Sequence, residues 1–287
     1  MIAYKKVGRA GQAELLPGGR WMLSVHGNGS GCVTDLDQDQ PQPQVLFTTF
    51  HAGEDPLRDS CTWIDRERPL SSFHVAVFDR AMTANKKGRI CIFRISALKK
   101  DSGTTFVAKR LSVIRDGPCQ AWRTSAALSE EYFIQQIKPD GERMSRLQLR
   151  RYSAHAHAGT TAVVERPVAL TSPVHLFFLP GNRVGSITRN AVDIFSFKEF
   201  KADDGSAMLD LALIHHISSP QNPYRMSPPF VRSSHTYLVS VHDTLRRIIV
   251  DHDMAVPPTF EETGKVAYDR GDPSRKAWFG PSACVLI

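Results

Sequence analysis

Apolar and polar residues follow one another along this chain in a pattern that recurs at a nearly constant interval. An apolar run, a short polar turn and a second apolar run form a unit, and this unit occurs five times. The first runs begin at Trp21, Phe73, Tyr132, Val184 and Tyr237, which are 52, 59, 52 and 53 residues apart. The second runs are residues 31–36, 89–95, 146–152, 191–197 and 245–250. Short apolar runs joined by polar turns predict five antiparallel β-hairpins.

The segments between paired runs hold residues that reverse a chain. Residues 27–31 alternate glycine with asparagine and serine, and residues 85–88, 139–142 and 188–190 each contain asparagine, aspartate, glycine or proline. Glycine and asparagine adopt positive φ at little cost, and proline presets a turn. These segments therefore support the hairpin interpretation.

Further β-like stretches separate the hairpins and give each unit three or four strands. They are residues 45–50, 106–114, 161–170 and 209–217. A radially repeated sheet of this size is a propeller blade. We therefore expect an all-β fold, an incomplete β-propeller of about five blades with a partial sixth, in a single repeat domain over residues 1–287. Another β fold such as a sandwich is the alternative, and residues 209–217 also fit a helical period.

A short polar or glycine-containing segment precedes most of the first runs, as at residues 16–20 and 179–183. The same kind of segment recurs at residues 279–283 and leads into a run that begins at Cys284, 47 residues after Tyr237. Because a propeller that does not close exposes sheet edges, we expect the chain to be truncated within a sixth unit. An unclosed chain of this kind is expected to associate with itself.

Composition excludes several classes of protein. With 41% hydrophobic and 23% charged residues among 287, the sequence is that of a globular protein. No apolar run is long enough to span a bilayer, and the first residues form no signal-peptide core. The five cysteines form no CxxC pair, which argues against disulfides and a zinc knuckle and favours a cytoplasmic or nuclear location. Cys32 and Cys91 fall in predicted strands, where we expect buried apolar residues.

The net charge of +7 is unevenly distributed. Residues 79–110 contain nine lysines or arginines and two aspartates. Lys86, Lys87 and Arg89, at a predicted hairpin loop, are the candidate residues for binding an acidic protein partner. Nucleic acid is a less favoured ligand, because the aromatic residues nearby, Phe93 and Phe106, fall in predicted strand cores.

Histidines and carboxylates offer fragments of a catalytic or metal site without completing one. His155 and His157, His215 and His216, and residues 251–253 lie in different units, and none supplies a full ligand set. We therefore assign no catalytic, cofactor-binding or metal-binding residue and expect a non-enzymatic protein. The alternative is a propeller hydrolase or lyase that uses carboxylates or histidines of the channel.

Several short motifs, in their order and spacing, resemble the propeller-like region of mushroom-type fungal F-box proteins. They are residues 14–23 (ELLPGGRWML), 29–37 (GSGCVTDLD), 178–183 (FLPGNR), 193–195 (DIF) and 278–282 (WFGPS). The resemblance implies a WD40-type region that recognises the substrate of a ubiquitin ligase. Residues 1–14 are too few for the helical F-box that docks to the ligase core. We therefore expect a protein partner and no ligase docking by this chain alone.

Overall fold

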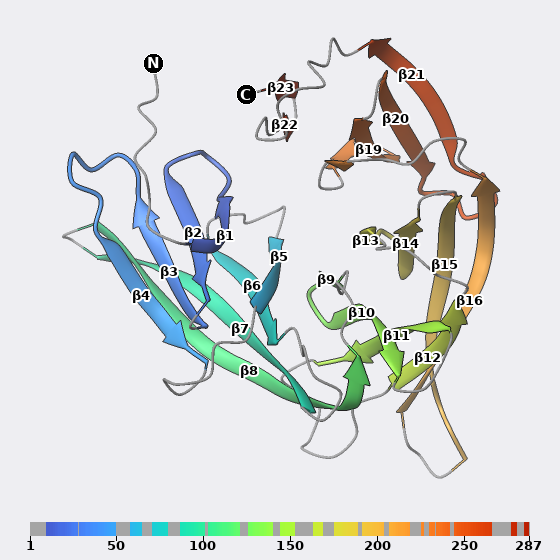
Figure 1. The fold of residues 1–287 in the computed structure, drawn as a ribbon, viewed down its shortest axis with the longest axis horizontal. Helices are drawn as coiled ribbons and strands as arrows, with labels where there is room; N and C mark the ends of the chain where they lie inside the picture. The colour runs from blue at the N-terminus through green and yellow to red at the C-terminus, as the bar shows by residue number, and fades with distance from the viewer. Residues whose placement is uncertain are drawn as a thin grey trace. The chain divides into compact units, whose positions relative to one another are not determined.

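The computed structural model describes eighteen segments of the chain, all of them strands or the turns beside them (Figure 1). They are residues 10–27, 29–49, 58–64, 71–79, 87–100, 103–120, 126–139, 144–152, 163–168, 175–188, 191–203, 207–218, 225–226, 230–232, 234–241, 244–265, 277–279 and 284–286. No helix occurs in these segments, and hence none that would cross a membrane. The chain divides into two compact units, Met1–Thr161 and Ala162–Ile287, which we describe separately.

The first unit contains strands β1 to β11. One four-stranded antiparallel sheet has the order β1 (Ala10–Leu15), β2 (Trp21–His26), β3 (Ser30–Asp35) and β4 (Pro43–Thr48). The next four strands follow in the same manner as β5 (Arg58–Ile64), β6 (Ser72–Asp79), β7 (Lys87–Lys100) and β8 (Gly103–Gln120). β10 (Tyr132–Pro139) pairs with β9 (Ala126–Leu128) and β11 (Ser145–Arg151), and its last two residues pair with the end of β8.

The second unit repeats this arrangement. It begins with β12 (Val163–Val168) and continues with a sheet of β13 (His175–Leu179), β14 (Arg183–Ile187), β15 (Ala191–Lys201) and β16 (Ala207–Ser218). A further sheet contains β17 (Arg225–Met226), β18 (Phe230–Arg232), β19 (His235–Val241), β20 (Thr244–Asp251) and β21 (Thr259–Lys265). β22 (Ala277–Phe279) and β23 (Cys284–Leu286) form an antiparallel pair.

All five predicted hairpins are confirmed. They are the antiparallel pairs β2–β3, β6–β7, β10–β11, β14–β15 and β19–β20. The helical alternative for residues 209–217 is wrong, because these residues belong to β16 and pair along its length with β15. The fold is therefore all-β, built from successive antiparallel sheets of the kind that form propeller blades.

Each sheet begins one strand earlier than the sequence pattern indicates. The segments at residues 16–20 and 179–183 are turns of hairpins that join β1 to β2 and β13 to β14. Gly18 and Gly19 have φ of 90° and 75°, and Gly181 and Asn182 have 75° and 54°. Residues other than glycine and asparagine rarely adopt this conformation, so the same turn recurs with the same residue types in both units.

The cores lie between successive sheets. Along β6, Val75 and Val77 contact the core shared with the β1–β4 sheet, whereas Ala76 and Phe78 contact a second core that includes Phe133 of β10. Alternate residues of a strand point to opposite faces, so this sheet is buried on both sides. In the second unit, residues of β13–β15 and of β19 and β20 share one core in the same way. The apolar runs of the hairpins thus pack between successive sheets.

Cys32 and Cys91 are buried in strands at 4% and 3% exposure, which confirms the prediction that they serve as small apolar residues. Neither residue forms a disulfide. Two glycines in strands make room for aromatic rings on the neighbouring strand. A Cβ atom on Gly31 would lie 2.1 Å from the Phe47 ring, and one on Gly185 would lie 2.0 Å from the Phe177 ring. Only glycine fits at these two positions without a shift of the ring.

Candidate interaction surface

The structure describes only part of the predicted basic patch. Lys86 lies outside the described residues, and Lys87 is the first residue of β7, opposite Pro118 of β8. Arg89 is half-buried in β7, opposite Arg115. The assignment of these three residues to a partner site therefore stays a prediction.

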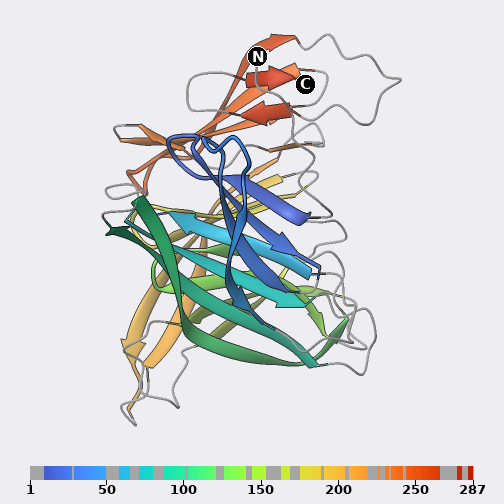
Figure 2. The same cartoon turned by 90° about the vertical axis from the view of Figure 1, so that its left-hand side faces the viewer.

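The other basic residues of the segment 79–110 that the structure describes lie along β7 and β8. These two long strands run side by side (Figure 2). Arg94 stands directly opposite Lys109, and both side chains are exposed. Like charges at directly opposed positions of a sheet are destabilising. The Arg94 Nε donates a hydrogen bond to the Ser72 hydroxyl at 2.9 Å, which holds the guanidinium, and no described carboxylate forms an ion pair with it.

Two more cations lie on the opposite face of this strand pair from Arg94 and Lys109. Lys99 and Arg110 are exposed, and within the described part of the chain neither they nor Lys109 form an ion pair. We call the exposed cations Arg94, Lys99, Lys109 and Arg110 the basic ribbon. Its cations project from both faces of the strand pair, and their charge would attract an acidic ligand.

Exposed apolar side chains lie among these cations. Leu98 of β7 and Val107 and Val113 of β8 are 45%, 49% and 41% exposed. Cross-strand register places Leu98 and Val107 on the same sheet face as Arg94 and Lys109. A partner that met this face would bury apolar area in addition to pairing charges.

At Phe106 the outer edge of β8 is covered by the Gln44 side chain, which forms the backbone hydrogen bonds that a neighbouring strand would form. The Gln44 Nε2 donates to the Phe106 carbonyl at 2.8 Å, and the Phe106 N–H donates to the Gln44 Oε1 at 3.3 Å. The same amide nitrogen lies 3.2 Å from the Thr105 hydroxyl. One carboxamide thus satisfies both backbone groups of Phe106, which shows that these groups point away from β7.

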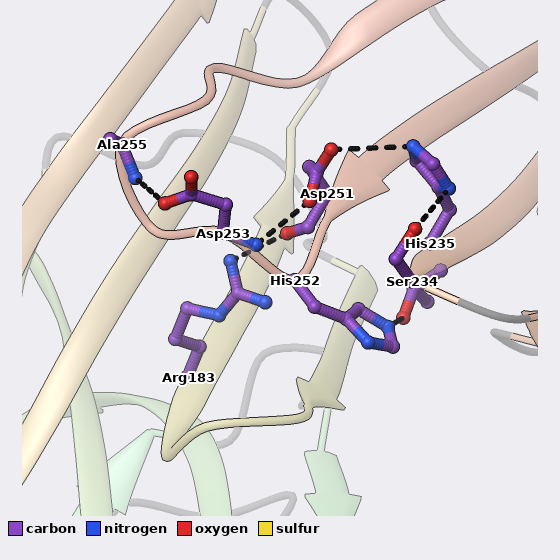
Figure 3. A network of polar contacts seen from close by, with 8 residues as sticks. Arg183, Ser234, His235, Asp251, His252, Asp253 and Ala255 are labelled. Carbon is purple, nitrogen blue, oxygen red and sulfur yellow. Dashed lines mark hydrogen bonds and ion pairs between the residues drawn. The ribbon is translucent and has the colours of Figure 1, made fainter.

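A polar cluster of the second unit lies at the base of the β19–β20 hairpin (Figure 3). The Asp251 carboxylate is 3.3 Å from the His235 Nε2 and accepts the Asp253 N–H at 2.8 Å. Asp253 in turn accepts the Ala255 N–H at 2.9 Å. Residues 251–253 offer only an incomplete metal-site fragment in the sequence, and in the structure their carboxylates contact their own turn and His235.

Arg183, which is fully buried, joins this cluster from β14 (Figure 3). Its Nη1 donates to the Asp251 carbonyl at 2.8 Å and its Nε to the Pro180 carbonyl at 2.9 Å. Burial lowers the pKa of the guanidinium, while the charges of Asp251 and Asp253 oppose this effect. The cluster therefore joins two neighbouring sheets, while the buried Arg183 Nη2 has no hydrogen-bond partner among the described residues.

A buried histidine lies between the second and third sheets of the first unit. The His74 Nδ1 is 2.8 Å from the Tyr152 hydroxyl, which donates to the Ser129 carbonyl. The imidazole also forms a hydrogen bond with the Glu130 backbone, which favours its charged form but is outweighed by burial. Burial, together with the charge of Arg94, lowers the pKa of His74 to about 4. The imidazole is neutral and structural.

The remaining histidines and carboxylates do not converge. His215 contacts the Met254 carbonyl at 2.8 Å, and His216 contacts the Asp193 carboxylate at 2.6 Å, whereas His155 and His157 lie outside the described residues. Among the residues that the structure describes, no three histidine, cysteine, aspartate or glutamate side chains are placed to hold a metal ion.

Comparisons with known proteins give the fold and no family. No protein-family model matches the chain, and no curated protein matches it in sequence. The complex of the fission yeast SREBP and SCAP binding domains is 8% identical, with a TM-score of 0.50 over 98% of this chain and 79% of that chain. Trypanosoma rangeli sialidase in complex with sialic acid is 10% identical, with a TM-score of 0.50 over 94% of this chain and 50% of that chain.

The WD40 domain of SCAP from fission yeast is 8% identical with a TM-score of 0.46, and this chain spans 64% of its length. At these identities the likeness concerns the fold, which is that of β-propellers. Because one similar structure is a complex of binding domains and another is a sialidase, the fold does not by itself separate a binding protein from an enzyme. The distinction between a binding protein and an enzyme therefore has to come from the side chains.

Proposed function

We propose that this chain is a non-enzymatic scaffold that binds a partner protein through an acidic region of that partner. The observation that carries the proposal is the exposed like-charge pair of Arg94 and Lys109, which lies beside exposed leucine and valine side chains. A charged rim around apolar side chains is typical of protein interfaces. The proposed contact extends along β7 to Arg89 and Lys87, and we include Lys86, which precedes the strand in the sequence.

A more specific proposal, on the identity of the partner, rests on the resemblance of the sequence motifs to fungal F-box proteins. In that case the partner is the substrate of a ubiquitin ligase, bound in the cytoplasm or nucleus, and docking to the ligase core belongs to a separate module. The chain by itself is then expected to capture the substrate without capturing ligase subunits.

The test is affinity capture followed by measurement of the association rate. The double variant Lys86→Glu with Lys87→Glu is expected to slow association with the captured partner at low salt and to leave the melting temperature unchanged. At high salt the difference should shrink, because screening weakens steering by exposed charges. The variant Lys198→Glu with Lys201→Glu is the control, since it changes the net charge equally at exposed positions of β15.

Two results would count against the proposal in different ways. A partner whose association rate is the same for the wild type and the Lys86 and Lys87 variant, at both salt concentrations, removes these residues from the site. Failure to capture any protein, together with turnover of a glycoside or ester substrate, contradicts the scaffold function itself.

A further inference from the structure

We infer that residues 107–110 of β8 form a strand-addition edge, to which an acidic, extended segment of the partner protein adds as a further strand. This inference rests on the proposed function and specifies how the partner binds. It concerns the backbone of β8 in addition to its charges. The arguments come from the register of β8, the charges beside it and the side chain of Gln44.

Backbone groups of β8 are directed outward along this edge. The Phe106 N–H and carbonyl bond to Gln44 and therefore point away from β7. The β7–β8 register is regular from Phe106 to Arg110. Since the direction of the backbone groups alternates along an antiparallel strand, Ala108 and Arg110 also point outward. Within the described part of the chain, β8 pairs beyond β7 only through Cys119 and Gln120.

The side chains at this edge select for acidic residues. Lys109 and Arg110 are adjacent, so they project to opposite faces of the sheet, and neither forms an ion pair within the described residues. An added strand with two adjacent carboxylates would place one on each face, against Lys109 and Arg110. Val107, which is 49% exposed, offers an apolar contact on the Lys109 face.

The same charges disfavour a second copy of this chain as the occupant. Antiparallel self-pairing of residues 107–110 would bring lysine and arginine of both copies together, and charged residues on an edge strand are a recognised protection against such pairing. The Gln44 carboxamide shows in addition that an amide group can form hydrogen bonds with the outward backbone groups of this edge in the folded chain. A partner strand would extend that pairing from Phe106 toward Arg110.

The test uses a fluorescein-labelled peptide of about six residues, a usual strand length, with two adjacent glutamates flanked by valines. Binding to the full chain is followed by fluorescence anisotropy at low salt. The matched peptide with glutamines in place of glutamates is expected to bind at least about tenfold more weakly. Hydrogen exchange of the Ala108 and Arg110 amides is expected to slow when the acidic peptide binds, whereas the Val107 and Lys109 amides, which face β7, should not change.

Two variants separate charge from strand pairing. Lys109→Glu with Arg110→Glu should abolish peptide binding, whereas the control Lys198→Glu with Lys201→Glu should retain it. Ala108→Pro removes one outward N–H from an edge, where proline is tolerated, and should weaken binding at least about tenfold with an unchanged melting temperature. If Ala108→Pro does not fold, a peptide with alternate backbone nitrogens methylated provides the same test from the other side.

Several outcomes would overturn the inference. Binding that is equal for the glutamate and glutamine peptides, or insensitive to both Ala108→Pro and peptide methylation, rules out an acidic added strand. Dimerisation that is lost in Ala108→Pro would identify a second copy as the occupant. If the peptide does not bind while the full chain still captures a partner, this inference fails and the proposed function stands.

Discussion

At the scale of single residues, His74 makes the stability of the first unit depend on pH. Its imidazole is 7% exposed and packs beside Tyr152 and the Trp63 ring, whose centroid is 5.1 Å away. Burial and the Arg94 charge hold the pKa of His74 at about 4 in the folded chain, below its ordinary value of 6.5. The folded state therefore excludes a proton that the unfolded chain accepts.

We predict that the free energy of unfolding falls as the pH is lowered from about 7 to about 4, by up to about 3 kcal/mol from this residue. The sign follows because only the unfolded state is protonated in that window, and the stabilisation is fully present above pH 6.5. Urea denaturation at a series of pH values measures it. In His74→Gln the slope should be reduced by about one proton.

The companion variant Tyr152→Phe tests the same site without removing the titrating group. It should lower the free energy of unfolding by about 1–3 kcal/mol, because the buried imidazole loses a partner, and should keep the pH slope. A slope that is unchanged in His74→Gln would contradict the assignment.

At the scale of the secondary-structure element, β8 is stabilised along its outer edge by a side chain instead of a strand. Gln44 and Phe106 are 62 residues apart in the sequence, and the carboxamide spans the gap between β4 and β8. Edge strands with unpaired backbone groups are prone to unwanted pairing. The glutamine therefore both links two sheets and protects one end of the edge.

We predict that Gln44→Ala lowers the free energy of unfolding by about 1–3 kcal/mol, since it leaves the Phe106 backbone groups without their amide partner. Exchange of the Phe106 amide should become faster. Gln42→Ala is the control, because Gln42 is exposed two residues earlier in the chain. Equal stability of the two variants would show that water replaces the carboxamide at no cost.

At the scale of the whole molecule, the sheets of each unit depend on their neighbours. In the first unit, Phe47 of β4 stacks on Phe93 of β7 with ring centroids 4.1 Å apart and an interplanar angle of 7°. Phe133 belongs to the other core of this unit. Stability in such repeats is approximately a sum of terms within sheets and between adjacent sheets.

We predict that Phe47→Leu and Phe93→Leu are coupled by about 0.5–1.5 kcal/mol in a double-mutant cycle, as expected for a contacting aromatic pair. The pair Phe47→Leu and Phe133→Leu, which lie in different cores, should be additive within about 0.5 kcal/mol. Urea denaturation of the full chain provides the four free energies of each cycle. Equal coupling in both cycles would contradict stabilisation between adjacent sheets.

The hairpins could be predicted from the sequence because their determinants are local. Alternation over a few residues and a turn rich in glycine or asparagine are sufficient to define β2–β3 or β14–β15. The strands β1 and β9, which precede two of the hairpins, were missed for the same reason. β1 reads AGQAEL and β9 has three residues, so neither shows alternation. The turns Gly18–Gly19 and Gly181–Asn182 carried the signal that a strand precedes them.

The candidate site also combines features that the sequence predicts with features that depend on contacts between distant residues. The excess of lysine and arginine in residues 79–110 was visible in the composition, because charge counts need no structure. Register between β7 and β8 decided that Arg94 faces Lys109 and that Lys109 and Arg110 flank an edge. The contact of Gln44 with Phe106 depends on the packing of one sheet against the next. Contacts between residues so far apart in the chain leave no periodic trace in the sequence, and only the tertiary structure brings them together.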